Sequence, residues 1–358
     1  MVLSNGSIKI VRDFLGMTQS SFAKKLKISQ PTLSKIEKGE KELTSDQIKQ
    51  FKMYFNEAFF HNNFERVNPK SFYRKLASIN KAMISSFEAR LNLLCTAIDK
   101  ALDIIDIETG LIPNIDANQF NLDFEYIATE VRLNFGIGGE PIDDIVNLLE
   151  SRGVLIHYFD YPFISSDNKK FDGVSFFIKG VPVILVNKKI PNSRKVFTIA
   201  HELGHLVCHF DSIIDIDRDI EKEANDFAAA FLAPADSIKT KLKSLTIDKL
   251  EKLKIEWNMS MAALVYRAFT LGNITNQTFR FWMMKLAPYR KSEPNEFILN
   301  NPALIYQLFE MTKEETEGLF FKELGFTETL IEELLGIKQT KEKVKLQLVK
   351  NYSINKTL

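Results

Sequence analysis

Three of the chain's five histidines lie within nine residues, in the stretch FTIAHELGHLVCHF at residues 197–210. On a helix, His201 and His205 share one face, so both imidazoles can bind one tetrahedral zinc ion. Glu202 lies about 100° further round the helix, where a carboxylate can take a proton from an attacking water and pass it to a leaving amine. This HExxH spacing predicts zinc-dependent hydrolysis of peptide bonds.

Such a zinc ion needs a third protein ligand and an open position for water. In an unbroken helix His209 lies about 12 Å along the axis from His201, too far to share the ion. Since HLVCHF has no glycine to break the helix, we expect His209 to support the site from behind. Glu221 and Glu223 in the following helix are the competing ligands. Both flank the same apolar face, so periodicity does not decide between them.

Two further features of a peptidase site stay open at the level of sequence. The donor that stabilises the oxyanion has three candidates, His209, Tyr266 and Arg267. The apolar strand VPVILVN, residues 181–187, precedes the histidine helix. It either accepts an extended substrate by strand addition or pairs only within its own sheet.

The elements around the histidines alternate between helix and strand. Two helices are predicted over residues 123–136 and 141–153, followed by strands over 154–161, 173–180 and 181–187. The junction at Lys179 and Gly180 predicts a tight hairpin. Helices carrying the two histidines and the two glutamates follow, and the second stops at Pro234. Residues 245–286 and 295–337 are also predicted to be helical.

The N-terminal segment is basic, although the whole chain has a formal net charge of only +1. Residues 1–56 carry ten Lys or Arg against five Asp or Glu. Short helices there are predicted to break at Gly16, at Lys27 and at Gly39. Thr18 and Ser29 cap two successive helices, the second with Pro31 in its first turn. This is the pattern of a helix-turn-helix, whose second helix turns four polar side chains outward: Gln30, Thr32, Ser34 and Lys35.

The composition of the chain limits the class of protein to which it can belong. With 45% hydrophobic and 26% charged residues, the chain is predicted to be globular, and no apolar run reaches the length of a membrane span. Cys95 and Cys208 are too few and too far apart for a disulfide scaffold, and the N-terminus lacks the apolar core of a signal peptide. We therefore expect a cytoplasmic protein. Apolar spacing over 70–105 predicts one long amphipathic helix, packed on a neighbouring domain or forming a dimeric coiled coil.

The two helices of the histidine region resemble a known family. RKVFTIAHELGHLVCH followed by EKEANDFAAAFLAP, and the later MSMAALVYRAFTLGNIT, resemble the ImmA/IrrE zinc metallopeptidases over roughly residues 120–285. The resemblance implies that Glu221, four residues before Asn225, is the third ligand, with Asn225 orienting the site. It also implies that relatives act on repressors of the XRE type.

The N-terminal motif TQSSFAKKLKISQPTLSKIEKG resembles the XRE family, which is Cro/repressor-like. The resemblance implies that Gln19 contacts the DNA backbone, and that Gln30, Thr32, Ser34 and Lys35 lie in or near the major groove. One such module reads a half-site, so dimeric binding is expected.

These observations predict an α+β protein with four parts. Residues 1–56 form an all-α XRE-like helix-turn-helix domain, 57–118 a helical spacer and linker, 119–286 a small mixed-sheet, zincin-like HExxH peptidase domain, and 287–358 a helical region of unknown role.

The predicted function is a DNA-binding regulator that is also a zinc endopeptidase, with Zn²⁺ held by His201, His205 and Glu221 and with Glu202 as general base. Its partners would be operator half-sites and a protein substrate, an XRE-type repressor or this chain's own N-terminal domain. The alternative is a non-proteolytic regulator whose zinc domain acts as a sensor or interaction module. Glu202 favours catalysis, because a structural zinc site needs no general base.

Overall fold

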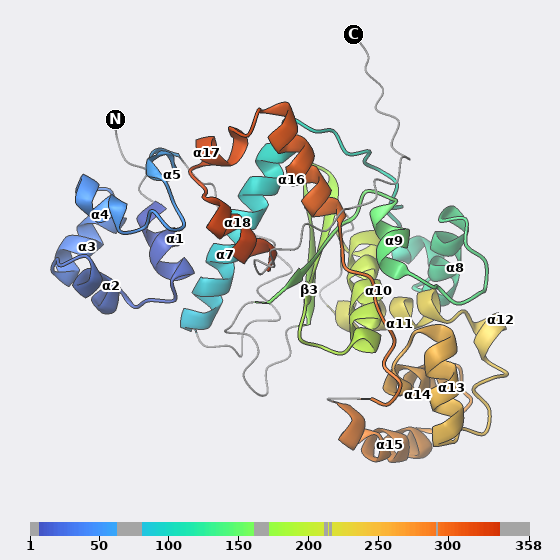
Figure 1. The fold of residues 1–358 in the computed structure, drawn as a ribbon. Coiled ribbons are helices and arrows are strands. Elements are labelled where there is room, and N and C mark those ends of the chain that lie inside the picture. The colour runs from blue at the N-terminus through green and yellow to red at the C-terminus, as the bar shows by residue number, and fades with distance from the viewer. Residues whose placement is uncertain are drawn as a thin grey trace, which may run out of the picture.

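A three-stranded mixed sheet divides the molecule into two sides (Figure 1). The structure is a computed structural model that describes residues 7–62, 81–160, 172–210, 214, 217–290 and 293–336. Helices cover both faces of the sheet, and the N-terminal helices lie beyond one of them. The fold is α+β, as the sequence predicts.

The sheet contains the strands β1 (Leu155–Phe159), β2 (Gly173–Ile178) and β3 (Val181–Asn187). Their order is β1-β3-β2, with β1 parallel and β2 antiparallel to β3. The predicted hairpin is confirmed, since Lys179 and Gly180 have φ of 50° and 80°, as a two-residue turn with a right-handed twist requires. Because β3 pairs on both sides, VPVILVN is an internal strand and cannot accept a substrate strand.

Successive side chains of each strand point to opposite faces of the sheet and so into two separate hydrophobic cores. Ile156, Ile184 and Val186 point into the core beneath the histidine helix. This side contains α8 (Phe124–Asn134), α9 (Ile145–Glu150), α10 (Asn192–Cys208), α11 (Ile220–Leu232), α12 (Ala235–Ile238), α13 (Ile247–Trp257), α14 (Met261–Thr270) and α15 (Asn276–Lys285). The short 3-10 helices η1 (Ala117–Phe120) and η2 (Ala287–Arg290) belong to it as well.

The opposite face is covered by α7 (Lys81–Ala101), α16 (Leu304–Glu315) and α18 (Glu328–Leu335), with α17 (Phe320–Leu324) between the last two. Leu155, Val183 and Leu185 point into this second core. Helix α7 is buried on almost every side, which is typical of a helix at the centre of a protein. Its burial favours packing within the chain over a coiled coil. Residues 70–80 of the predicted long helix lie outside the described part.

The N-terminal helices are α1 (Ser7–Phe14), α2 (Gln19–Lys25), α3 (Gln30–Glu37), α4 (Ser45–Lys49) and α5 (Glu57–His61). Thr18 and Ser29 cap α2 and α3 through their side chains, as predicted. The predicted breaks also occur, because Gly16, Lys27 and Gly39 all have positive φ. This region is therefore the all-α helix-turn-helix that the sequence indicates.

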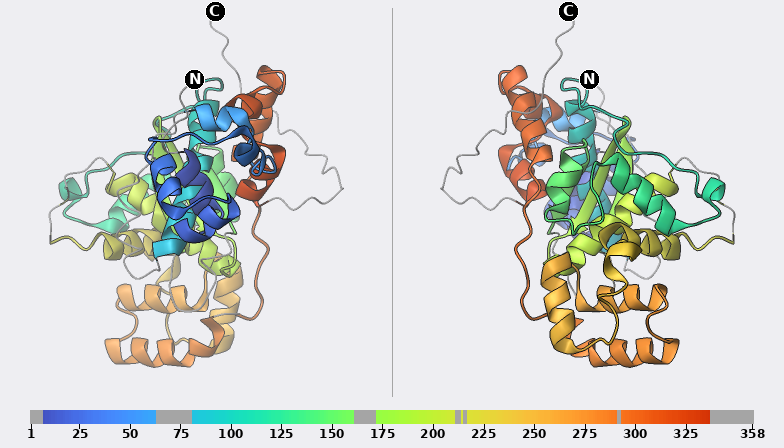
Figure 2. Two further views of the ribbon diagram at one scale, coloured as in Figure 1. Left: turned by 90° about the vertical axis from the view of Figure 1, so that its left-hand side faces the viewer. Right: turned by 90° about the vertical axis from the view of Figure 1, so that its right-hand side faces the viewer.

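One prediction for the C-terminal half is wrong. Residues 295–303 have no regular secondary structure, and helix begins only at Leu304. The segment is held by tertiary hydrogen bonds that a helix could not make, from Asn192 to the Phe297 carbonyl and from Tyr158 to the Asn300 carbonyl. Figure 2 shows it running from the α13–α15 end of the molecule to α16. Among the described helices, none is both long and apolar enough to cross a membrane.

His157 in β1 gives the fold a defined sensitivity to acid. Burial, with a smaller contribution from Lys188, lowers its pKa to about 4, although a hydrogen bond with the Leu334 backbone raises it. Unfolded histidine binds a proton near pH 6.5, so the unfolded state binds more protons as the pH falls below that value. The contribution of neutral His157 to the free energy of unfolding is therefore complete above pH 6.5. It is lost as the pH falls towards 4, and the loss reaches about 2–3 kcal/mol.

We expect His157→Gln to flatten the pH dependence of the free energy of unfolding, measured by urea titration between pH 7 and pH 5. The matched variant His61→Gln changes an exposed histidine and should keep the wild-type slope. Glu150 has a pKa raised to about 7 by burial and acts in the opposite direction, but it is common to all three proteins and cancels in the comparison. An identical slope in His157→Gln and wild type would refute this assignment.

Candidate metal centre and DNA-binding surface

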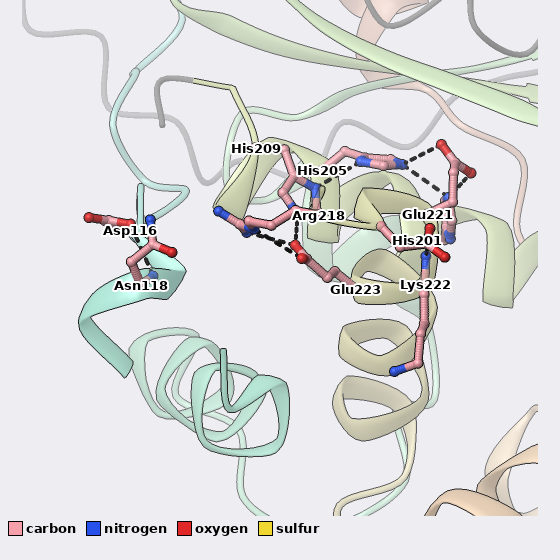
Figure 3. Close-up of polar contacts among 10 residues, drawn as sticks. Asp116, Asn118, His201, His205, His209, Arg218, Glu221, Lys222 and Glu223 are labelled. Carbon is pink, nitrogen blue, oxygen red and sulfur yellow. Dashed lines mark hydrogen bonds and ion pairs between the residues drawn. The ribbon is translucent and has the colours of Figure 1, made fainter. Parts of the chain in front are cut away.

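Helix α10 carries both histidines of the HExxH motif on the face that meets α11. His201 and His205 are 9% and 6% exposed, and their Nε2 atoms lie 3.1 Å apart. The four-residue spacing places the rings one above the other, as the sequence predicts for a shared ligand. Figure 3 shows both rings pointing toward Glu221 of the neighbouring helix.

Glu221 completes a triangle with the two imidazoles. Its Oε2 lies 3.4 Å from His201 Nε2, and its Oε1 lies 3.4 Å from His205 Nε2. A tetrahedral zinc ion with ligands at about 2.0–2.1 Å separates those ligands by about 3.3–3.4 Å. The three side chains therefore fit zinc in both donor chemistry and spacing. Glu221 is half exposed, so the fourth position can open to solvent and substrate.

Hydrogen bonds behind the rings set the tautomers that metal ligands need. Asn225 Oδ1 lies 3.0 Å from His201 Nδ1, which orients that ring. Behind His205, Nδ1 lies 2.9 Å from His209 Nδ1, and His209 Nε2 lies 2.9 Å from Glu223 Oε2. A carboxylate only accepts, so His209 carries its proton on Nε2 and accepts from the Nδ1–H of His205. Both ligand Nε2 atoms are left with lone pairs for the ion.

Glu223, the competing ligand, lies on the other side of His205. Its carboxylate is 8% exposed and accepts hydrogen bonds from Arg218 at 3.0 and 2.6 Å. Burial alone would raise the pKa of Glu223, but the bonds from Arg218 and His209 lower it, so the group is a carboxylate. Burial also lowers the pKa of His209 to about 4, and the ring is neutral. The structure thus brings Glu221 to the histidines and uses Glu223 to hold His209.

The close approach of α10 and α11 depends on Gly204. A Cβ atom there would lie 2.9 Å from Cδ1 and 3.2 Å from Cγ of Phe227, whose side chain is fully buried. A larger residue at this crossing would displace the Phe227 side chain or one of the two helices. Because Gly204 lies beside His205, the same contact brings Glu221 within reach of both histidines.

Glu202 lies on the sheet side of α10 and is 2% exposed. Ser175 of β2 donates a hydrogen bond to its Oε2 at 2.8 Å. The strand comes close because Gly173 has no side chain, and a Cβ there would lie 2.6 Å from Thr198 Cγ2. Glu202 is therefore fixed beside the metal triad without being part of it. Neither Ser175 nor Arg218 is predicted from the sequence, although the alternation of β2, which points Ser175 inward, is a signal for the first.

The three oxyanion candidates have different surroundings. Arg267 is buried, donates to the Ala233 carbonyl and forms an ion pair with Glu125, so it ties α14 to α11 and α8. Tyr266 donates its hydroxyl proton to Asp226 at 2.6 Å, one residue after Asn225. His209 contacts Glu223 behind His205. These contacts commit His209 and Arg267 to supporting roles.

The helix-turn-helix presents its predicted DNA-contacting residues at the surface. Gln30 and Lys35 are exposed on α3, while Gln19, Thr32 and Ser34 are partly exposed. Gln30 Nε2 donates to Gln19 Oε1 at 2.6 Å, and Gln19 Nε2 donates to Glu37 Oε2 at 2.9 Å. Glu37 is held in turn by Arg12. This chain of bonds arranges the amide of Gln30 before any DNA is bound.

Family models match the two regions of the chain that contain these residues. Residues 149–269 match the IrrE N-terminal-like domain of the M78 peptidases, and residues 8–56 match the helix-turn-helix model. The chain thus contains a helix-turn-helix region and a region similar to a domain of a peptidase family. The order of the two regions matches the ImmA/IrrE architecture with an N-terminal XRE-type helix-turn-helix. No curated protein matches the chain.

The geometry predicts different outcomes for the two glutamates of α11. Glu221→Ala removes a ligand, so metal content after dialysis should fall from about one zinc per chain to near zero, as it should in His201→Ala and His205→Ala. Glu223→Ala should keep the stoichiometry but weaken zinc affinity by about 10–100-fold, because it loosens His209. Both are measured by competition with a chromophoric chelator. Loss of metal in Glu223→Ala and full retention in Glu221→Ala would reverse the assignment.

Proposed function

We propose that this protein is a zinc-dependent endopeptidase joined to a DNA-binding module, and that it controls gene expression by cleaving a repressor of the XRE type. The observation that carries the proposal is the pairing of a three-ligand site with a buried carboxylate beside it, Glu202. A purely structural zinc site closes all four positions with protein ligands and has no use for such a base. The family match supports the peptidase class.

His201, His205 and Glu221 would hold the ion. Zinc supplies Lewis acidity, which makes a water acidic enough to attack near neutral pH. Glu202 takes the proton of the attacking water and passes it to the departing amine of the scissile bond. Ser175 holds Glu202 in place for both transfers through its hydrogen bond to Oε2.

An extended segment of the substrate would bind along β2. Within the described residues β2 pairs only with β3 and lies at one edge of the sheet, where strand addition takes place. Ser175, in the middle of this strand, contacts Glu202, so the edge passes beside the proposed base. Backbone pairing would give affinity, and side-chain pockets would give specificity.

The DNA-binding module would place the peptidase at the genes it controls. A single helix-turn-helix reads a half-site, so we propose that two copies bind an operator in the cytoplasm, where a repressor substrate is also found. The helix-turn-helix match and the exposed residues of α3 support this assignment.

Glu202→Gln tests the enzymatic part. The change keeps shape and polarity but removes the proton acceptor, so peptidase activity on purified XRE-type repressors should fall by about 10²- to 10⁴-fold. Metal content and DNA binding should stay at wild-type levels, and Glu140→Gln, which changes an exposed carboxylate, should leave all three unchanged. If Glu202→Gln still induces the controlled genes in cells, the protein does not signal by proteolysis, and the sensor function takes its place.

The DNA-binding part makes a separate prediction. Lys35→Ala should weaken binding to every sequence and reduce the dependence of log K on log salt concentration by about one unit, because one phosphate contact is lost. Gln30→Ala should instead reduce discrimination between operator and random DNA. Lys252→Ala, an exposed lysine of α13, serves as the control for charge. Equal effects of Lys252→Ala and Lys35→Ala on binding would contradict this assignment.

A further inference from the structure

The DNA-binding helices do not form a separate hydrophobic core. Val11 and Phe14 of α1, Phe22 of α2 and Leu33 of α3 belong to the same core as α7, one face of the sheet and the C-terminal helices. Arg90 of α7 is buried, donates to the Phe14 carbonyl at 2.7 Å and forms an ion pair with Glu333 of α18. Helices that read DNA are thus packed into the body of the protein.

The C-terminal helices grip the end of the DNA-binding region through backbone contacts. Phe55 and Phe326 form an isolated antiparallel bridge. On either side of it, the Asn56 amide donates to the Gly325 carbonyl at 2.9 Å, and the Thr327 amide donates to the Tyr54 carbonyl at 3.1 Å. Backbone pairing fixes the relative position of the two segments more strictly than side-chain contacts would.

The other end of the same C-terminal segment reaches the active-site helix. Helix α10 begins after Pro191, which has no side chain that can cap it. Glu296, in the non-helical segment 293–303, accepts a hydrogen bond from the Ser193 amide and supplies the missing cap. Its carboxylate also pairs with Lys254, which is fully buried, at 2.7 Å. A negative charge at this helix terminus is further stabilised by the helix dipole.

Between these two ends the segment is anchored to the sheet side of the peptidase domain. Glu150 of α9 accepts from the amides of Ala303 at 3.0 Å and of Leu304 at 2.9 Å, and so caps α16. Asn300 donates to Asp144 at 2.6 Å. Helices α16 and α18 pack on β1. One continuous stretch of chain therefore contacts α5, the sheet and the start of α10.

We propose that residues 293–335 are a brace that joins the DNA-binding helices and the active-site helix into one cooperative unit. The DNA-binding helices share a core and a backbone pairing with the brace, and the brace caps α10, so the three unfold together. Zinc bound at the metal site then raises the free energy of unfolding of the DNA-binding helices, and bound DNA raises that of the metal-site helices. The brace is a property of the fold, and its test needs no peptidase activity.

A substitution at Gly325 can break the contact between α17 and α5 selectively. At φ +82°, an added Cβ would lie 2.0 Å from the backbone nitrogen of Phe59 and 2.3 Å from its Cα, so Gly325→Ala must push α17 off α5. Gly318, in the same region, has φ +79° and nothing within 4 Å of an added Cβ. Gly318→Ala therefore imposes the same backbone strain without the clash and is the matched control.

The experiment is native-state hydrogen exchange of the full chain across a urea series below the unfolding midpoint. In the wild type and in Gly318→Ala, slowly exchanging amides of α1–α5 and of α10 should converge on one unfolding free energy. In Gly325→Ala, exchange from α1–α5 should become faster than exchange from α10 by about tenfold or more, or about 1.4 kcal/mol. Wild-type amides of α1–α5 that open in a separate, weaker transition would overturn the proposal, even if Gly325→Ala fails to fold.

A second arm adds zinc. The brace predicts that zinc slows exchange in α1–α5 as well as in α10 and α11 of the wild type, and only in α10 and α11 of Gly325→Ala. Protection confined to α10 and α11 in the wild type would contradict the brace. A protein that binds no zinc would refute the proposed metal site, but would leave the urea series to decide on the brace.

Discussion

The crossing of α10 and α11 is the contact on which the candidate active site depends. Gly204 and Phe227 set how near the two helices come, and the contacts of both glutamates with the histidines span that crossing. Glu221 meets His201 and His205 on one side, while Glu223 meets His209 on the other. A ligand and a supporting residue are therefore supplied by two side chains only two positions apart on one helix.

Helical periodicity predicted that His201 and His205 share one face, but it could not predict which glutamate of α11 meets them. The spacing of His201 and His205 fixes their shared face, because that geometry is local to one helix. The choice between Glu221 and Glu223 depends instead on how α11 is rotated against α10. That rotation is set by contacts between the helices, such as the one between Glu223 and His209. The bonds from Arg218, just before α11, also hold Glu223 away from the triad. Family resemblance implied Glu221, where the residues alone left both open.

The difference between local and tertiary contacts also explains which features of the fold could be predicted from the sequence. Caps at Thr18 and Ser29 and the turn at Lys179 and Gly180 follow from short-range chemistry, and the sequence predicted each of them. The position of β3 in the centre of the sheet does not follow from short-range chemistry, because a central strand and a buried edge strand can have the same apolar sequence. Residues 295–303 are not helical because distant groups bind their backbone, and no local pattern records those contacts.

The two faces of the sheet explain why one small sheet can serve both parts of the molecule. Ser175 points to one face and holds Glu202, whereas His157 points to the other and meets the Leu334 backbone in α18. Neighbouring residues of three strands thus contact the proposed chemistry on one side and the C-terminal helices on the other.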